Sequence, residues 1–281
     1  MESTNGIVVC SVWLRGRICH PELIFSFGDI RLLCCMQGWF RSVYRFLYFV
    51  IFTLGGIAVY FWSLLWGTSR KDAGRKLRKR WLLKVPDHVG LRLDIEGTPY
   101  QGTCLYVGNH ISYIDPILIL KYVDANVVAK AEVAHWPLVG FGASIAGTIF
   151  VHRDRKSSRD ETARAVREAL ESGISILVFP EGTTSGGPTT LPFRPRSFEA
   201  AYLAGVPVQP IAIFYESPKA AYIGKDTFIP HFFRFFRLKE IRAHVHFGEL
   251  LYGPDTCDTA KRWIDDQMIL QSQIQSTYES A

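Results

Sequence analysis

The sequence predicts an α/β domain with a mostly parallel sheet flanked by helices, preceded by an N-terminal membrane-anchoring helical segment. Two observations lead to this prediction. From about residue 90 onward, short apolar runs typical of buried strands alternate with helical segments. Before them lies an uncharged run of 21 residues, 46–66. Of the 281 residues, 48% are hydrophobic and 21% charged, which excludes a disordered or collagen-like chain.

Residues 1–35 are predicted to be an extension of uncertain character. Their apolar stretch, Ile7 to Leu14, is short and is followed by Arg15 and Arg17, so it does not have the form of a signal peptide. We expect either a poorly ordered extension or a start-site artefact, and we place the membrane anchor and its basic helix at residues 36–85.

The apolar run 46–66 is long enough to cross a bilayer as a helix, at ~1.5 Å per residue against a hydrocarbon core of about 30 Å. Trp62 and Trp66 lie at its end, where interfacial anchors are expected. Two forms of attachment stay open. The helix spans the membrane, or it forms a hairpin within one leaflet that bends at Gly55 and Gly56.

A basic segment follows, which we predict to be helical over residues 69–84. Residues 70–80 contain seven basic side chains and one acidic one, Asp72, and so account for the whole net charge of +6. The rest of the chain is balanced, which argues against a nucleic-acid-binding face. A basic segment beside an apolar one favours anionic lipid headgroups. Only Arg41 and Arg45 closely precede the apolar run, so the positive-inside rule places the remainder on the cytoplasmic side.

The main domain is predicted to extend over residues 86–281. Alternating or continuous apolar runs predict strands over 91–95, 103–107, 127–130, 148–151, 174–179, 208–214 and 242–247. Helical patterns predict helices over 115–122, 136–146, 159–172, 197–203 and 259–272. The clearest is 159–172, where Ser158 and Glu161 form a capping box and Gly173 has the place of a C′ glycine.

The six cysteines include no CxxC pair, so they predict no metal site, and they suggest a reducing compartment.

His110 lies in the loop YVGNHISYIDP directly after the predicted strand 103–107, and Asp115 follows five positions later. Catalytic groups in α/β proteins gather at the carboxyl ends of strands. A carboxylate beside a histidine fixes its tautomer and stabilises the imidazolium, so the pair is a candidate general base. The spacing alone leaves a loop-capping histidine as the alternative.

A second loop, FPEGTTSGGP at 179–188, follows the predicted strand 174–179. Its glycines and threonines offer backbone N–H groups and hydroxyls to a polar ligand, whereas Glu181 is suited to accept a ligand hydroxyl or to hold a basic residue. It lacks a Walker pattern, so ATP hydrolysis is unsupported. Lys130 and Arg153 end other predicted strands, and Arg194 follows the loop; together they could bind a phosphate.

These segments taken together resemble the lysophospholipid and glycerolipid acyltransferases of the 1-acylglycerol-3-phosphate acyltransferase type. NHISYID at 109–115 resembles the NHxSxxD box of that family, and the boxes AKAEVAHWPLVG, GTIFVHR, FPEGTTS and VPVQPIAI follow in the family's order. The resemblance covers residues 90–215 and implies a glycerolipid acyltransferase-like fold.

The resemblance implies that His110, oriented by Asp115, removes a proton from the free hydroxyl of a lysophospholipid, which then attacks the thioester of acyl-CoA or acyl-carrier protein. No cofactor and no acyl-enzyme are required. Asn109 and Ser112 complete the first box and are expected at the substrate.

The acceptor implied is lysophosphatidic acid, giving phosphatidic acid in phospholipid biosynthesis. Contacts with its glycerol and phosphate are expected from Lys130, Arg153, Glu181, Gly182 and Thr183. One departure stands out: Thr184 occupies a position where many family members have a phosphate-binding arginine. Arg194 is a candidate substitute, and the alternative acceptors are a lyso-ornithine lipid and lysophosphatidylcholine.

The sequence leaves two further functions less favoured. A non-catalytic lipid-binding protein is less favoured because the His110 and Asp115 pair is intact, and a hydrolase is less favoured because no GxSxG elbow is present. The aromatic and basic run 231–237, HFFRFFR, fits either lipid contact or packing in the protein.

Overall fold

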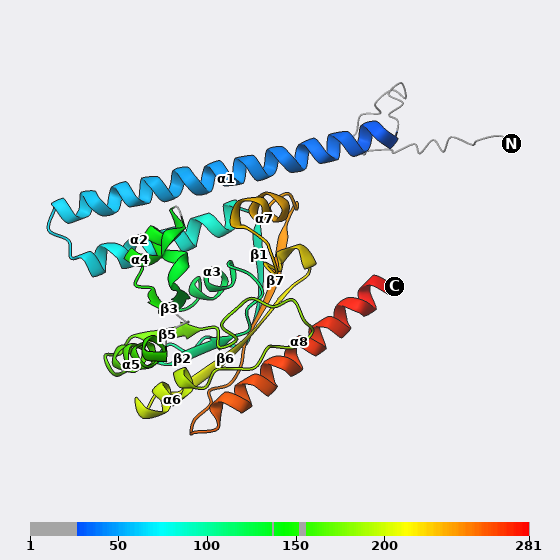
Figure 1. Cartoon of the computed structure of the whole chain (residues 1–281). Helices are drawn as coiled ribbons and strands as arrows, with labels where there is room; N and C mark the ends of the chain where they lie inside the picture. Colours follow the sequence, from blue (N-terminus) through cyan, green and yellow to red (C-terminus); the bar gives the residue numbers. More distant parts are fainter. Residues whose placement is uncertain (1–26, 137, 152–155, 281) are drawn as a thin grey trace.

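A single seven-stranded sheet forms the centre of the domain, and helices cover both of its faces (Figure 1). The computed structural model describes residues 27–136, 138–151 and 156–280, so most of the predicted N-terminal extension lies outside it. The strand order is β1-β7-β6-β2-β5-β3-β4. Every neighbouring pair is parallel except β6 with β7, which confirms the predicted mostly parallel α/β class.

The strands are β1 (Leu91–Glu96), β2 (Leu105–Gly108), β3 (Ala125–Lys130), β4 (Ile149–Val151), β5 (Ser175–Val178), β6 (Val208–Tyr215) and β7 (Ile241–Phe247). The helices are α1 (Phe27–Leu65), α2 (Arg70–His88), α3 (Asp115–Leu120), α4 (Val139–Ile145), α5 (Lys156–Glu171), α6 (Arg196–Leu203), α7 (Phe228–Phe235) and α8 (Thr256–Ser280). Short 3₁₀ turns cover Ala131–His135 and Pro218–Ala220.

The core has two layers, one on each face of the sheet. On one face, α2, α3 and α7 bury side chains such as Val85, Leu118 and Phe232. On the other, α5, α6 and α8 bury Val166, Phe198 and Ile264 among others. Strands β2 and β5 lie between these layers and are buried throughout, as continuous apolar runs in a parallel sheet require.

Helix α1 is the one described helix long and apolar enough to cross a membrane, over Met36–Leu65. It runs alongside α2 and past α7 (Figure 1), and most of its apolar residues are exposed. The helix is continuous through Gly55 and Gly56, so the predicted alternative of a hairpin bending there is wrong. At Gly56 the absent side chain instead makes room for Leu77, since a Cβ there would lie 2.5 Å from Leu77 Cδ1.

Both ends of the packed part of α1 contact the domain. The Arg45 guanidinium donates to the carbonyls of Phe236, Leu238 and Lys239 at 2.7 to 3.1 Å, where α7 ends. Four turns further on, Phe61 stacks on Phe141 of α4, with ring centroids 6.0 Å apart. The helix is therefore held along the surface of the domain from Arg45 to Phe61, and its N-terminal turns extend beyond α7 (Figure 1).

Helices α2 and α8 are longer than the sequence predicts, and three others differ from the prediction in kind. Helix α5 begins at Lys156, so Ser158 lies inside the helix and the predicted capping box is wrong, whereas Gly173 does end the helix with φ +80°. The predicted helix 136–146 is shorter, because the chain turns at Leu138, which has φ +63°, before α4 begins. Helix α7 was not predicted, because it is only eight residues long and contains Pro230, so its pattern is too short to mark a helix.

Candidate active site

The carboxyl ends of three adjacent central strands meet at one edge of the sheet. Strand β2 ends at Gly108 and leads into Asn109 and His110, β5 leads into Phe179 and Glu181, and β6 ends at Tyr215. The strands are neighbours in the order β6-β2-β5, so the two loops expected to carry chemistry lie side by side.

His110 and Asp115 form a hydrogen-bonded pair. His110 Nδ1 lies 2.8 Å from Asp115 Oδ2. The same carboxylate oxygen accepts the backbone N–H groups of Ile111 and Ser112 at 2.7 and 2.8 Å. The other oxygen, Oδ1, accepts the hydroxyl of Tyr215 at 2.7 Å. Because Nδ1 is held by the carboxylate, Nε2 is the ring nitrogen that can take a proton from a substrate.

The carboxylate is fully buried, and its phenol partner stays protonated. Burial and the negative charge of Asp115 raise the pKa of Tyr215 well above its ordinary value, so Tyr215 acts as a donor at any working pH. Phe179 stacks on the imidazole of His110, with ring centroids 4.3 Å apart and an interplanar angle of 20°. The orientation of His110 is thus fixed from two sides.

Glu181 organises the second loop. Its Oε1 accepts the backbone N–H of His110 at 2.8 Å, and its Oε2 accepts the Ser185 hydroxyl and the Leu191 N–H at 2.8 and 2.9 Å. Glu181 is 4% exposed and does not line the cavity beside His110. In this structure the carboxylate joins the two loops; a contact with an acceptor stays a prediction.

Asn109 and Ser112 point into the protein. The Asn109 amide pairs with the backbone of Ile213 in β6, accepting its N–H at 2.7 Å and donating to its carbonyl at 2.9 Å. Ser112 is fully buried, and its hydroxyl has no hydrogen-bond partner among the described residues. Neither residue lines the cavity. Both lie within the protein, in the loop that follows β2.

An apolar cavity of about 430 Å³ opens beside His110. It extends from the 179–188 loop beneath α2 and α4 to the inner side of α1. Its apolar lining comes mainly from Phe49, Ile57, Leu77, Trp81, Val85, Tyr113, Ile117, Leu120, Trp136, Val139, Phe228 and Phe232. A space of this composition is suited to a hydrocarbon chain whose reactive end lies at His110.

The predicted cationic residues are only partly brought together. Lys130 lines the cavity, with Nζ 2.9 Å from Glu132 Oε1. Arg194 packs its guanidinium over Gly182: a Cβ at Gly182 would lie 2.8 Å from Arg194 Cζ, and Gly182 has φ +77°. Thr183 lines the cavity next to Gly182. Arg153 lies outside the described residues.

Thr184, which stands where the family often has arginine, donates its hydroxyl to the Tyr222 carbonyl. This contact ties the second loop to segment 218–222. Tyr215, Tyr222 and the stacked Phe179 were not predicted as site residues. Tyr215 could have been found, because it follows the predicted strand 208–214 at the same edge of the sheet; Tyr222 has no such signal.

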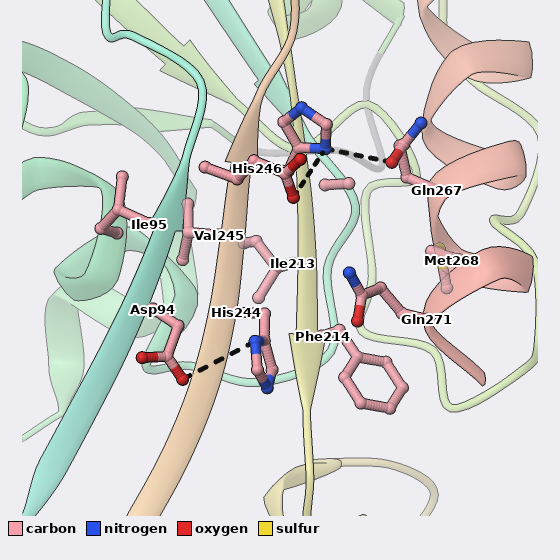
Figure 2. A pocket seen from close by; sticks show the side chains of 12 residues that line it. Asp94, Ile95, Ile213, Phe214, His244, Val245, His246, Gln267, Met268 and Gln271 are labelled. Atoms are coloured by element: carbon pink, nitrogen blue, oxygen red, sulfur yellow. Dashed lines mark hydrogen bonds and ion pairs between the residues drawn. The ribbon is translucent and has the colours of Figure 1, made fainter. Parts of the chain in front are cut away.

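A second cavity, of about 300 Å³, lies on the opposite face of the sheet, between α8 and strands β1 and β7. Figure 2 shows His244 directed toward Asp94, and His246 toward Gln267 of α8. None of the predicted site residues lines it. Within the described ranges, no three His, Cys, Asp or Glu side chains are placed to hold a metal ion.

Comparisons with known proteins agree with this geometry. The family model named Acyltransferase matches residues 92–214. A lyso-ornithine lipid O-acyltransferase from Pseudomonas aeruginosa is 32% identical over 195 residues, which are 67% of this chain and 75% of that protein. A 1-acyl-sn-glycerol-3-phosphate acyltransferase from Neisseria meningitidis is 29% identical over 167 residues, 57% and 64% of the two chains.

The fold also has a solved counterpart. The crystal structure of the 1-acyl-sn-glycerophosphate (LPA) acyltransferase from Thermotoga maritima superposes with a TM-score of 0.66 at 20% identity, covering 85% of this chain and 98% of that one. The matched family segment contains His110, Asp115 and the Glu181 loop, and a relative above 30% identity is covered over three-quarters of its length. This chain therefore belongs to the acyltransferase family, as a lysophospholipid-type enzyme of phospholipid biosynthesis that acylates a hydroxyl group.

Proposed function

We propose that this enzyme transfers a fatty acyl group from acyl-CoA or acyl-carrier protein to the free hydroxyl of a lyso-lipid, with His110 as general base. The observation that carries the proposal is the His110 and Asp115 pair at the head of an apolar cavity. His110 Nε2 takes the hydroxyl proton while the hydroxyl oxygen attacks the thioester carbonyl. The C–S bond then breaks, and the imidazolium returns its proton to the departing thiolate.

Two features of the site support this sequence of steps. Asp115 stabilises the imidazolium formed when His110 accepts the proton, and it holds Nδ1–H so that Nε2 faces the substrate. The apolar cavity binds the acyl chain and keeps water from the thioester. The mechanism requires no cofactor.

Lysophosphatidic acid is one acceptor, as the family resemblance implies. Its phosphate needs a cation, and Arg194 is the candidate from the second loop, because its guanidinium packs over Gly182, which lines the cavity. Lys130 also reaches the cavity, where it pairs with Glu132.

A lyso-ornithine lipid is the second acceptor, and two observations favour it. Thr184 uses its hydroxyl on the Tyr222 carbonyl, so this loop position provides no positive charge for a phosphate. Relatives named as lyso-ornithine lipid O-acyltransferases, from Pseudomonas aeruginosa and Rhodobacter capsulatus, are 32% and 31% identical to this chain.

The enzyme works at the cytoplasmic surface of a membrane, in this proposal, with α1 lying in one leaflet. Spanning would require α1 to leave the domain, but Arg45 and Phe61 hold it along the domain surface. The exposed cations of α2 lie beside it, and Leu83 is exposed among them. This combination suits an anionic lipid surface.

The test is acyl transfer by the purified enzyme in lipid vesicles, with labelled acyl-CoA or acyl-carrier protein and a panel of acceptors. The panel contains lysophosphatidic acid, a lyso-ornithine lipid and lysophosphatidylcholine. We expect turnover of one acceptor by the wild type and its loss, by about 10³-fold or more, in His110→Ala. Turnover of the lyso-ornithine lipid alone would reject the lysophosphatidic acid assignment. Equal activity of wild type and His110→Ala would reject the general-base role.

A further inference from the structure

The geometry points to His231 as a positioning residue of this active site, whose neutral imidazole joins the catalytic loop, residues 110–115, to segment 218–222. Through this joint His231 holds the mouth of the cavity in its reactive shape. The inference rests on the function proposed above and adds a residue to it that lies outside the family boxes.

His231 projects from α7 and is fully buried. Its Nε2 lies 3.1 Å from the Ala221 carbonyl oxygen, and its Nδ1 lies 3.2 Å from the Tyr113 hydroxyl. A carbonyl can only accept, so Nε2 carries the proton. In the neutral ring Nδ1 then accepts from the Tyr113 hydroxyl. One side chain thus bonds to both segments.

The segments are also bonded to each other around the site. The Tyr222 N–H donates to the Ile111 carbonyl at 3.0 Å, and the Ser185 N–H donates to the His110 carbonyl at 2.7 Å. The Thr184 hydroxyl donates to the Tyr222 carbonyl. The catalytic loop, the 179–188 loop and segment 218–222 therefore form one network, and His231 supports it from behind.

Tyr113 transmits this support to the cavity. Its ring packs edge-on against Trp136, Tyr222 and Phe228, with centroids 5.1 to 6.3 Å apart, and all four residues line the cavity. Tyr113 also lies between His110 and Asp115 in the chain. A displacement of the Tyr113 ring would therefore move the aromatic wall and the catalytic loop together.

The joint requires the neutral form of His231. Burial lowers the pKa of His231, and the cation of Arg234 lowers it further, whereas the Ala221 carbonyl and Asp226 raise it. Asp226 is itself paired with Arg234 at 2.8 Å. The remaining titratable groups that face the ring are Tyr113 and Tyr222, and burial raises the pKa of both phenols, so they stay neutral. Protonation would make Nδ1 a donor, so the Tyr113 hydroxyl would have to turn and accept, and a positive charge would be placed in a buried site.

Steady-state kinetics of the full-length enzyme in vesicles test the joint with four variants: His231→Phe, Tyr113→Phe, the double variant and His231→Gln. Both single apolar substitutions should lower kcat by about tenfold, with KM for the acyl donor little changed. Both break the same joint, so the double variant should be no slower than the slower single variant. In His231→Gln the carboxamide can donate to Ala221 and accept from Tyr113, so kcat should return to within about threefold of wild type.

The pH profile of kcat separates positioning from a general packing role. In the wild type, protonation of His231 should add to the acid dependence that any general base gives, so the acid limb of log kcat should steepen toward a slope of two. In His231→Gln the slope should be one. His244→Gln is the matched control: His244 lies on the opposite face, 3.7 Å from Asp94 and 3.5 Å from Glu216, and its replacement should leave kcat and the slope unchanged.

Additive losses in the double variant, a His231→Gln enzyme as slow as His231→Phe, or an unaltered acid slope would each overturn the inference while leaving the acyl-transfer function in place. If His231→Phe does not fold, the test rests on the kcat of Tyr113→Phe and on the acid slope of log kcat in His231→Gln. A wild type without acyl transfer would overturn the proposed function itself, and with it this role for His231.

Discussion

Asp115 accepts four hydrogen bonds: three at Oδ2, from His110 and two backbone N–H groups, and one at Oδ1 from Tyr215. An amide in its place would turn an N–H group toward donors and would lose the charge that stabilises the imidazolium. We therefore expect Asp115→Asn to lower kcat by about 10²-fold or more. Initial rates at saturating substrate measure this loss.

Tyr215→Phe is the control for that substitution. It removes only the donor to Oδ1 and leaves the His110 contact intact. Its kcat should fall less than that of Asp115→Asn, because the carboxylate keeps its charge and its bond to His110 and loses only one charge-assisted hydrogen bond, worth about 1.5–3 kcal/mol. A Tyr215→Phe enzyme as slow as Asp115→Asn would contradict the idea that the imidazole contact is the important one.

A substitution at Gly182 tests the role of Arg194 in acceptor binding while leaving the arginine in the chain. Gly182 has φ +77°, and an alanine there would place its Cβ 2.8 Å from Arg194 Cζ. The guanidinium would therefore be displaced from its position over residue 182, which lines the cavity. If Arg194 binds the anionic group of the acceptor, Gly182→Ala should raise the acceptor KM by about tenfold. Substrate-saturation curves measure the effect.

Gly205→Ala is the matched control. Gly205 also has positive φ, +67°, but a Cβ there meets nothing within 4 Å. Both variants should lose about 1 kcal/mol of unfolding free energy to backbone strain. Only Gly182→Ala should alter the KM for the acceptor; an equal change in both variants would show that strain, and not Arg194, is responsible.

At the scale of elements, the junction of α1 with the end of α7 depends on Arg45. Its guanidinium satisfies three carbonyls and packs against Gly90, where a Cβ would lie 2.0 Å from Arg45 Nη2. Arg45→Met would leave the buried Phe236 carbonyl without its charged donor, at a cost of about 2–3 kcal/mol.

The melting temperature measures this cost, and Arg41→Met is the control. Arg41 is more exposed and makes one hydrogen bond with the described residues, to the Arg237 carbonyl at 2.8 Å. Arg45→Met should lower Tm by about 5 °C or more, and Arg41→Met by much less. Equal shifts would mean that α1 is held by its apolar contacts alone.

Helix α7 also makes the stability of the fold sensitive to pH through His231. Because burial lowers its pKa below the ordinary value of 6.5, the unfolded chain binds a proton at His231 that the folded chain does not. The free energy of unfolding should therefore fall as the pH drops below 6.5, by at most about 1.4 kcal/mol per pH unit from this group. Urea unfolding at pH 7.5 and 5.5 should show a smaller decrease for His231→Gln than for wild type.

Strands and catalytic loops were more predictable than the helices that cover them. A continuous apolar run such as 174–179 has one physical explanation in an alternating α/β chain, and the loop after it must lie at the edge where β2 also ends. Helix α7 buries Phe232 and Phe235 on one side, but its eight residues cover little more than two turns and include Pro230, so the sequence does not mark it as a helix. The contacts of Glu181 were equally out of reach, because the backbone groups it accepts belong to His110 and to Leu191, ten residues along the chain.

At the scale of the whole molecule, the elements proposed to meet the membrane lie on one face of the sheet, and α5, α6 and α8 lie on the other (Figure 1). An α1 that lies in one leaflet should expose both of its ends on the same side. Trp39→Cys and Gly67→Cys, in a background with the native cysteines replaced, should both react with a membrane-impermeant maleimide from the cytoplasmic side. Labelling of Trp39→Cys only from the far side would demonstrate spanning.

Phe49 and Ile57 of α1 line the cavity, while Ile51 and Leu54 on its outer surface are exposed. A single helix thus separates two hydrocarbon environments, the proposed bilayer and the acyl cavity. A fatty acyl chain that moves from the bilayer into the cavity passes between two apolar environments. The hydrophobic effect therefore contributes little net free energy to its binding in the cavity. Occupancy of the cavity by the lipid substrate should then follow the mole fraction of that substrate in the membrane surface. Dilution of the surface with an inert detergent should slow the enzyme even when the bulk concentration of the substrate is constant.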